Sequence, residues 1–331
     1  MSHQVRSMLT RITERHVVTL VEKGLTMKYN DFRSIMSNNT NKIEGAYERI
    51  SPTAWLTAYQ RTLSDIPLSN EMFRELQEII KQTRSAAEVQ ELEKLKRPET
   101  SFIWESRFKI VNRLLKEQHV DQVLEIASGY SPRGINMAKD PSVEYVEIDL
   151  PNIIEEKRRI VEKLVGQSEA PTEPNLHLAE GNALESQDLF TAARFFKAKP
   201  VAVVNEGLLP YLNHNEKAIL GKNIHRLLER FGGAWITPDI ATQTQAALFK
   251  ERIIGRAARI EHLTGIDIMK NRFENEEAAR SFFESLGFSV EQHSFMEIAG
   301  ELVSSDHWKL SMKQIKKIIE RLTAFVVKAH N

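Results

Sequence analysis

Apolar residues follow two different patterns along this chain, and the pattern changes near residue 120. Before that point they recur at three- and four-residue spacing, which is typical of amphipathic helices. After it, short apolar runs alternate with helical patterns, as in a parallel sheet covered by helices. The pattern therefore predicts an N-terminal helical region followed by an α/β domain.

The first hundred residues are predicted to be helical throughout, with turns between the helices. Ser51 followed by Pro52 is typical of a helix start, because proline fits the first helical position. Ser85 and Glu88 have the spacing of a capping box, which predicts a second start. Pro98 should end the helix that follows.

A further helix is predicted from Thr100 onward, and it carries an arginine on its apolar face. Ile103, Arg107 and Ile110 share that face at helical spacing. A buried guanidinium needs a carboxylate or another acceptor, because burying an unpaired charge is costly. An internal salt bridge and a bound ligand both satisfy this requirement.

Seven apolar runs in the second part of the chain are candidate strands. They are centred near Val123, Val146, Leu178, Val203, Ile236, Val290 and Trp308. We find no internal repeat and no low-complexity tract. The sequence predicts a helical cap over residues 1–98 and an α/β domain over residues 99–331, built on a mostly parallel sheet of seven strands.

The first strand runs into a loop with one glycine in its tight part, VLEIASGYSPRG. In an open parallel sheet, ligands bind beyond the carboxyl ends of the strands. Gly129 permits a sharp turn and a close backbone approach to a ligand. Ala127 and Pro132 depart from the G-x-G-x-x-G fingerprint, which disfavours a dinucleotide pyrophosphate and favours a nucleoside.

The second strand ends on a carboxylate, Asp149, twenty residues after Gly129. This offset is the one expected for an acidic residue that binds ribose hydroxyls. Asp149 can instead cap the helix that starts near Pro151, and one side chain can fill both roles. Glu147, two residues earlier on the same face, is the competing ribose ligand.

The third and fourth strand ends carry further polar groups. Asn182 and Ala183 follow the third strand and could form hydrogen bonds with the edge of an adenine, although these residues alone favour a plain turn. The fourth strand runs directly into Glu206, and a carboxylate at the end of a buried strand is hard to explain as packing. Glu206 is therefore a candidate partner for a cationic group of a ligand.

Five segments in order resemble the leucine carboxyl methyltransferase family of class I S-adenosylmethionine-dependent methyltransferases. The resemblance extends from about Ser51 to Phe295 and is carried by PTAWLTAYQR, ESRFKIVNRLL, VLEIASGYSPR, VEIDLPNIIEEK and EGLLPYL. It implies a Rossmann-like fold, S-adenosylmethionine as the cofactor, and O-methyl transfer.

The resemblance also implies roles at the methionine end of the cofactor. By position, Arg107 would bind the methionine carboxylate and Glu206 would lie near the methionine amino group. Arg61 stands next to the position of a basic cofactor contact in the family. A ligand carboxylate would satisfy the guanidinium of Arg107 as well as a protein carboxylate would.

At the nucleoside end, the resemblance implies that Gly129 lies against the cofactor backbone and that Asp149 binds the ribose. Asn182 and Ala183 would lie beside the adenine. The family usually has glycine where Ala127 stands in this chain.

The methyl acceptor determines what further chemistry is needed. A carboxylate acceptor needs no base, whereas a phenol or an alcohol needs one, and no His/Asp pair stands out in the sequence. Tyr211 and Arg133 are candidates to orient an anionic acceptor, although Tyr211 can equally be a packing residue. Two other functions remain: an NAD-dependent dehydrogenase, disfavoured by the missing glycines, and a catalytically silent methyltransferase-fold binding module.

Composition narrows the class of partner. The 45 basic and 45 acidic residues give a net charge of +0, which disfavours a dedicated nucleic-acid binder and favours a small-molecule acceptor. There is no cysteine, so the reactive sulfur would arrive with the cofactor, and no metal site is expected. The sequence shows neither a signal peptide nor a membrane span, and we expect a cytoplasmic protein.

Overall fold

The computed structural model divides the chain into two compact units, residues 1–50 and residues 51–331. The residues that it describes are 9–13, 17–20, 25–28, 51–94, 96, 98–166, 175–248, 257, 258, 260–262, 264–304 and 311–330. The predicted boundary after residue 98 does not coincide with this division, because the helices before it pack within the second unit. A functional cap formed by residues 1–98 stays a prediction.

The first unit contains an antiparallel sheet of order β1-β2-β3. Its strands are β1 (Leu9–Thr13), β2 (Val17–Leu20) and β3 (Leu25–Lys28). The prediction of helices throughout the first hundred residues is wrong for these segments. They are rich in threonine and valine, whose branched Cβ atoms favour strands over helices.

The second unit begins with three helices, and the sequence predicts the starts of the first and the third. They are α3 (Ser51–Arg61), α4 (Ser69–Thr83) and α5 (Ala86–Lys94). The capping box before α5 is confirmed: Ser85 N donates to Glu88 Oε2 at 2.9 Å, and Glu88 N donates to Ser85 Oγ at 3.3 Å. Helix α3 packs on α4, and α4 packs on α8.

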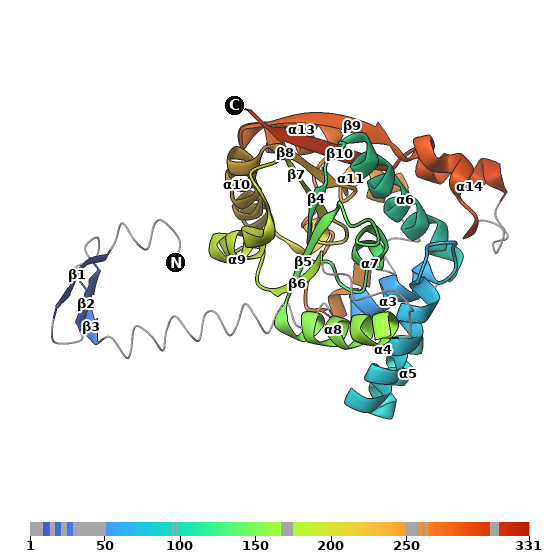
Figure 1. The fold of residues 1–331 in the computed structure, drawn as a ribbon. Coiled ribbons are helices and arrows are strands. Elements are labelled where there is room, and N and C mark those ends of the chain that lie inside the picture. Colours follow the sequence, from blue (N-terminus) through green and yellow to red (C-terminus); the bar gives the residue numbers. More distant parts are fainter. Residues whose placement is uncertain are drawn as a thin grey trace. The chain divides into compact units, whose positions relative to one another are not determined.

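A seven-stranded sheet of order β6-β5-β4-β7-β8-β10-β9 forms the centre of this unit (Figure 1). Its strands are β4 (Gln122–Ile126), β5 (Glu144–Asp149), β6 (Leu176–Glu180), β7 (Val201–Asn205), β8 (Gly233–Thr237), β9 (Phe288–Ser294) and β10 (Thr323–Ala329). All pairs are parallel except those of β10, which is antiparallel to β8 and β9. The predicted α/β class is therefore confirmed. The last strand is β10, whereas Trp308 lies outside the described residues.

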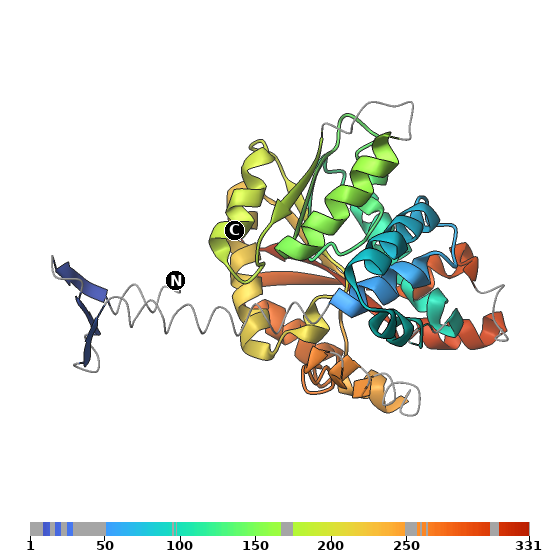
Figure 2. The ribbon, with the colours of Figure 1, turned by 90° about the horizontal axis from the view of Figure 1, so that it is seen from below.

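Helices cover both faces of this sheet, as Figures 1 and 2 show. The remaining helices are α6 (Ser101–Glu117), α7 (Arg133–Met137), α8 (Pro151–Gly166), α9 (Ser186–Ala192), α10 (His214–Phe231), α11 (Gln243–Leu248), α13 (Glu276–Ser285) and α14 (Met312–Ile319). Short 3-10 turns are η2 (Pro98–Thr100), η3 (Ala193–Phe195), η4 (Leu209–Tyr211) and η5 (Phe295–Glu301). Within the described part of the chain, no helix is both long enough and apolar enough to cross a membrane.

The order of the strands places β4 in the middle of the parallel part of the sheet. From β4 the chain moves outward through β5 to β6, and it then crosses to β7 on the other side of β4. Ligands of open α/β sheets bind at this kind of reversal, beyond the carboxyl ends of the strands. The ends of β4, β5 and β7 therefore define the place where the functional residues should meet.

Candidate functional site

The loop after β4 is held by the carboxylate at the end of β5. Gly129 N donates to Asp149 Oδ2 at 2.7 Å, and Leu150 N donates to Asp149 Oδ1 at 2.7 Å. Both Ala127 and Gly129 have positive φ, 52° and 50°, so the tight turn persists although alanine stands at a position that favours glycine. Burial raises the pKa of the Asp149 carboxyl, and the donated backbone N–H groups oppose this rise.

Glu147, the competing ribose ligand, lies in a different environment. Its side chain is fully buried and forms an ion pair with Lys157 of α8, while neither of its oxygens accepts a well-aligned hydrogen bond. Burial raises the pKa of Glu147 to about 7, although the Lys157 ammonium acts to lower it. Of the three carboxylates on β5, Glu144, Glu147 and Asp149, only Asp149 lies at the exit of the strand.

Arg133 is fully buried and binds three side chains, which come from α6, from β4 and from the chain after β7. Its Nε donates to Asn112 Oδ1 at 2.8 Å, one terminal nitrogen pairs with Glu125, and the other pairs with Glu206 Oε2 at 2.7 Å. Tyr145 donates its hydroxyl to the other oxygen of Glu125 at 2.8 Å. The structure thus places Arg133 among protein carboxylates, and the prediction that it orients an acceptor stays a prediction.

Glu206 is shared between two arginines. Its Oε1 pairs with Arg61 of α3 at 2.9 Å, and its Oε2 pairs with Arg133. Burial acts to raise the pKa of Glu206, but Arg61, Arg133 and Arg107 outweigh it and hold this pKa at about 2. Glu206 is therefore a carboxylate at any physiological pH, and it keeps lone pairs for further donors.

Arg107 pairs with Asp239, which follows β8 and is itself buried. Asp239 also accepts N–H bonds from Gly207 and Leu208 at 2.8 to 2.9 Å, and so it fixes the chain after Glu206. The Nε atoms of Arg107 and Arg61 are buried and have no hydrogen-bond partner. Two buried donors at a strand-end cluster are what a ligand carboxylate requires.

Asn182 and Ala183 lie beside Asp149, because Gly181 N donates to Asp149 O at 2.9 Å. Asn182 forms a turn of its own: its Oδ1 accepts from Leu184 N at 3.0 Å. The side chain thus orders this loop locally.

The structure brings most of the predicted site residues together. Gly129, Asp149, Asn182 and Ala183 lie around the ends of β4, β5 and β6, while Arg61, Arg107, Arg133 and Glu206 form one network of charges. Tyr211 lies apart and packs against a small apolar cluster formed by Ala257, Ile260 and Ile268.

Asp239 is the main member of this network that the sequence reasoning missed. The run GAWITPDI places it just after a buried strand, in the same situation that identified Glu206. Asn205 was passed over in the same way: its Nδ2 donates to Asp239 Oδ2 at 2.7 Å, and its Oδ1 accepts from Trp235 Nε1 at 2.7 Å. Both Asp239 and Asn205 would have been found if the polar residues at the end of every apolar run had been considered.

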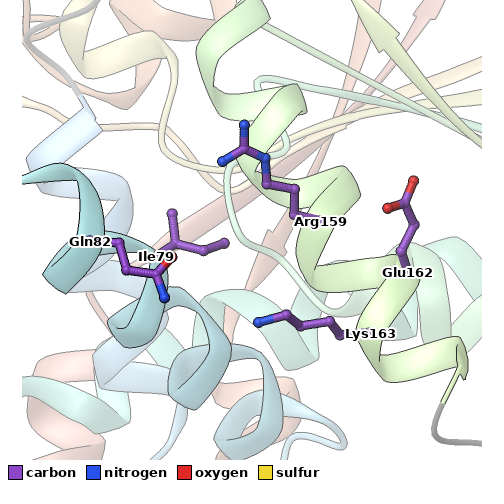
Figure 3. A pocket seen from close by; sticks show the side chains of 5 residues that line it. All are labelled: Ile79, Gln82, Arg159, Glu162 and Lys163. Atoms are coloured by element: carbon purple, nitrogen blue, oxygen red, sulfur yellow. The ribbon is translucent and has the colours of Figure 1, made fainter.

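A surface pocket between α4 and α8 is separate from this network (Figure 3). Its lining consists of Ile79, Gln82, Arg159, Glu162 and Lys163. None of these residues belongs to a strand end or to the charge network. Among the described residues, no group of three His, Asp or Glu side chains could hold a metal ion.

Comparisons with known proteins agree with this architecture. Residues 64–225 match the family model described as leucine carboxyl methyltransferase. No curated protein matches the chain. A solved structure of a DUF574 family protein from Streptomyces avermitilis superposes with a TM-score of 0.52 at 18% identity, covering 84% of this chain and 97% of that one.

A second solved structure, magnesium protoporphyrin IX methyltransferase from Synechocystis with bound SAH, has a TM-score of 0.43 and 10% identity, covering 71% of this chain and 86% of that one. The matched family model spans the glycine loop, the Asp149 strand end and Glu206, and methyltransferases of this family use S-adenosylmethionine. The chain is thus an S-adenosylmethionine-dependent methyltransferase with a class I fold, and over residues 64–225 it is similar to the leucine carboxyl methyltransferase family.

Proposed function

We propose that this enzyme transfers the methyl group of S-adenosylmethionine to a carboxylate or hydroxyl oxygen of a small molecule. The observation that carries the proposal is the buried charge network at the ends of β4, β7 and β8. The network contains arginines, which suit the methionine carboxylate of the cofactor, and carboxylates, which suit its methionine ammonium group. The cofactor itself supplies the activated methyl group.

The methionine end fits the unsatisfied donors of this network. The buried Nε atoms of Arg61 and Arg107 have no hydrogen-bond partner among the described residues. A ligand carboxylate would accept hydrogen bonds from both guanidinium groups. Glu206 is held ionised by its arginines and can accept from the cofactor ammonium in addition to them.

The nucleoside end fits the neighbouring strand ends. Asp149 uses its two oxygens for Gly129 and Leu150, and each oxygen retains acceptor capacity for a ribose hydroxyl. The burial of Glu147 and its pairing with Lys157 favour Asp149 over Glu147 as the ribose ligand. The position of Asn182 and Ala183 next to Asp149 along the sheet edge supports a role for them at the adenine.

No His/Asp pair stands out in the sequence as a base, and among oxygen acceptors this favours a carboxylate over a hydroxyl. Methyl transfer from a sulfonium depends mainly on holding the acceptor in line with the methyl group, and positioning alone supplies much of the rate enhancement. A carboxylate acceptor is already a nucleophile at neutral pH. The family match favours this chemistry over hydride transfer from a nicotinamide cofactor.

Calorimetric titration with S-adenosylmethionine and S-adenosylhomocysteine tests the cofactor site. We expect both to bind the wild type, and we expect Asp149→Ala to weaken binding at least tenfold, since hydrogen bonds to a charged group contribute about 1.5–3 kcal/mol. Asp121→Ala is the matched control. Asp121 precedes β4, at the end of the strand opposite to the site, and its side chain pairs with Lys199. Failure of both ligands to bind the wild type would refute the proposal.

Turnover separates an enzyme from a silent binding module. A panel of carboxylic acids, phenols and alcohols is incubated with S-adenosylmethionine, and products are detected by mass. We expect a methyl ester or methyl ether from at least one acceptor class. Cofactor binding without product from any class would favour the binding module instead.

A further inference from the structure

A second group of basic side chains lies beyond the ends of β7 and β8, away from the cofactor network. Lys217 belongs to α10, which follows η4 after β7. Arg272 precedes Phe273, which forms a parallel bridge with Thr242 of the segment after β8. Asn271 Nδ2 donates to Pro210 O at 3.1 Å, which ties this second segment to the chain after Glu206.

Lys217 is buried without a counter-charge. Its Nζ donates to Leu212 O at 2.7 Å and to Asn271 O, and no carboxylate among the described residues forms an ion pair with it. Burial lowers the pKa of Lys217 to about 8, and Asp239 and Glu216 only partly oppose this effect. An ammonium has three donors, so one remains for another acceptor.

Arg272 is half-buried, and fewer of its hydrogen-bond donors have an acceptor among the described residues. The described residues accept one of its five donors: its terminal nitrogen donates to Thr242 O at 3.3 Å. Its Nε is buried and has no partner among the described residues. Burial lowers the pKa of Arg272, and no carboxylate in the described part of the chain opposes this. A cation held in this way is costly unless an anion completes it.

The ring contacts beside Lys217 are aromatic, while the carboxylates of Asp239 and Glu216 act on it without forming an ion pair. The Phe273 ring lies 5.3 Å from Lys217 Nζ, and the His214 ring lies 5.7 Å from Phe273. Burial and the charge of Lys217 lower the pKa of His214, against a backbone hydrogen bond with Arg272 that acts to raise it, and so they favour the neutral imidazole. The apolar cluster around Tyr211 also contains Ile266 and Met269, the latter three residues before Arg272.

We propose that Arg272 and Lys217 form a subsite for an anionic group, a carboxylate or a phosphate, on an amphiphilic methyl acceptor. The apolar part of the acceptor contacts the cluster around Tyr211. This inference rests on the proposed function, because it assigns the anion to the acceptor, and it adds a recognition group distinct from the oxygen that is methylated.

Titration of simple amphiphiles into the full chain, with and without S-adenosylhomocysteine, tests the subsite. The probes are octanoate, octyl phosphate and neutral octanol. We expect the anions to bind at least tenfold more tightly than octanol, and the stronger of the two anions identifies the group. Arg272→Gln should weaken anion binding about tenfold and leave octanol unchanged.

Lys270→Gln is the matched control, because Lys270 lies beside the subsite with its side chain 84% exposed and pairs at 3.5 Å with Asp267. It should leave all three affinities unchanged. Arg272→Lys, which keeps the charge, should restore part of the anion preference and keeps the test valid should Arg272→Gln fail to fold.

Equal affinity for octanoate and octanol, no binding of either anion, or an equal loss in Lys270→Gln would overturn the subsite. The cofactor titration separates this failure from failure of the proposed function. If the chain binds S-adenosylhomocysteine but shows no anion preference, the subsite is refuted and the methyltransferase proposal stands. If the chain does not bind S-adenosylhomocysteine, the methyltransferase proposal itself is refuted.

Discussion

Arg107 and Asp239 form an ion pair that joins the helix before the sheet to the chain after β8. Asp239 at the same time accepts N–H bonds from Gly207 and Leu208, which follow Glu206. A ligand carboxylate that binds Arg107 must therefore share the guanidinium with Asp239. Binding of a cofactor carboxylate at Arg107 would in this way be linked to the chain that follows Glu206.

Replacement of Arg107 tests this link. We expect Arg107→Gln to weaken S-adenosylhomocysteine binding ten- to a hundredfold, because a charge-assisted hydrogen bond contributes about 1.5–3 kcal/mol. The measurement is calorimetric titration. Arg113→Gln on the same helix is the control, since Arg113 is exposed and pairs with Glu117. An unchanged affinity in Arg107→Gln would show that Arg107 serves only Asp239.

The pKa of Glu206 predicts a stability change in acid. Because the folded pKa of about 2 lies below the unfolded value of 4.5, ionised Glu206 stabilises the fold above about pH 4.5 and loses this contribution as the pH falls toward 2. For this buried side chain the full contribution is on the order of 3 kcal/mol.

Urea unfolding of the wild type and Glu206→Gln measures this contribution. We expect the variant to be less stable at pH 7, and we expect the difference to shrink between about pH 4.5 and pH 3. Glu180→Gln, at an exposed glutamate paired at 3.6 Å with Arg158, should show no such change. A difference that stays constant down to pH 3 would contradict the assignment.

The fold was predictable from the sequence because each parallel strand is buried on both faces and reads as an apolar run. Val203 and Ile236 mark β7 and β8 in this way. The site was predictable in part, because ligands of open parallel sheets bind beyond the carboxyl ends of the strands, and a polar residue at the end of an apolar run marks such a place. This reasoning identified Glu206 and Asp149 correctly as strand-end carboxylates.

What the sequence could not give was the pairing between distant charges. The partner of Arg107 is 132 residues away, and helical periodicity shows only that the arginine faces inward. The sequence makes Arg133 a candidate to orient an anionic acceptor, but it does not show that Glu125 inside β4 pairs with Arg133 in the core. Short strands such as β2, without a strong alternating pattern, were interpreted as helix for the same lack of tertiary information.

Gly134 is predicted to be intolerant of any side chain. A Cβ at this position would overlap Glu147 Oε1 and lie 2.9 Å from Leu176 Cδ1. Glu147 cannot move away easily, because it is buried and paired with Lys157. We expect Gly134→Ala to cost about 1–3 kcal/mol of unfolding free energy, measured by urea unfolding. In Gly300→Ala the added Cβ meets nothing within 4 Å, and stability should be unchanged. Equal stability of the two variants would contradict the packing argument.

The ion pair between Lys157 and Glu147 predicts a pH dependence of opposite sign to that of Glu206. The folded pKa of Glu147, about 7, lies above its unfolded value of 4.5, so its contribution to stability is fully present below pH 4.5 and decreases as the pH rises to about 7. Above pH 7 the ionised Glu147 of the wild type is compensated by Lys157. Lys157→Met removes this compensation and raises the pKa of Glu147 further.

The stability of Lys157→Met should therefore continue to fall above pH 7, where that of the wild type levels off. We expect a small deficit at pH 5 and a deficit of about 3–5 kcal/mol at pH 8 to 9, because one partner of a buried pair has been removed. Lys163→Met on the same helix is the control, since Lys163 is half exposed and pairs at 3.0 Å with Glu75. Urea unfolding across this pH range measures the deficit. A deficit independent of pH would mean that Lys157 contributes packing alone. A deficit that grows with pH would identify the charge of Lys157 as the group that stabilises the buried Glu147 beneath the Asp149 strand end.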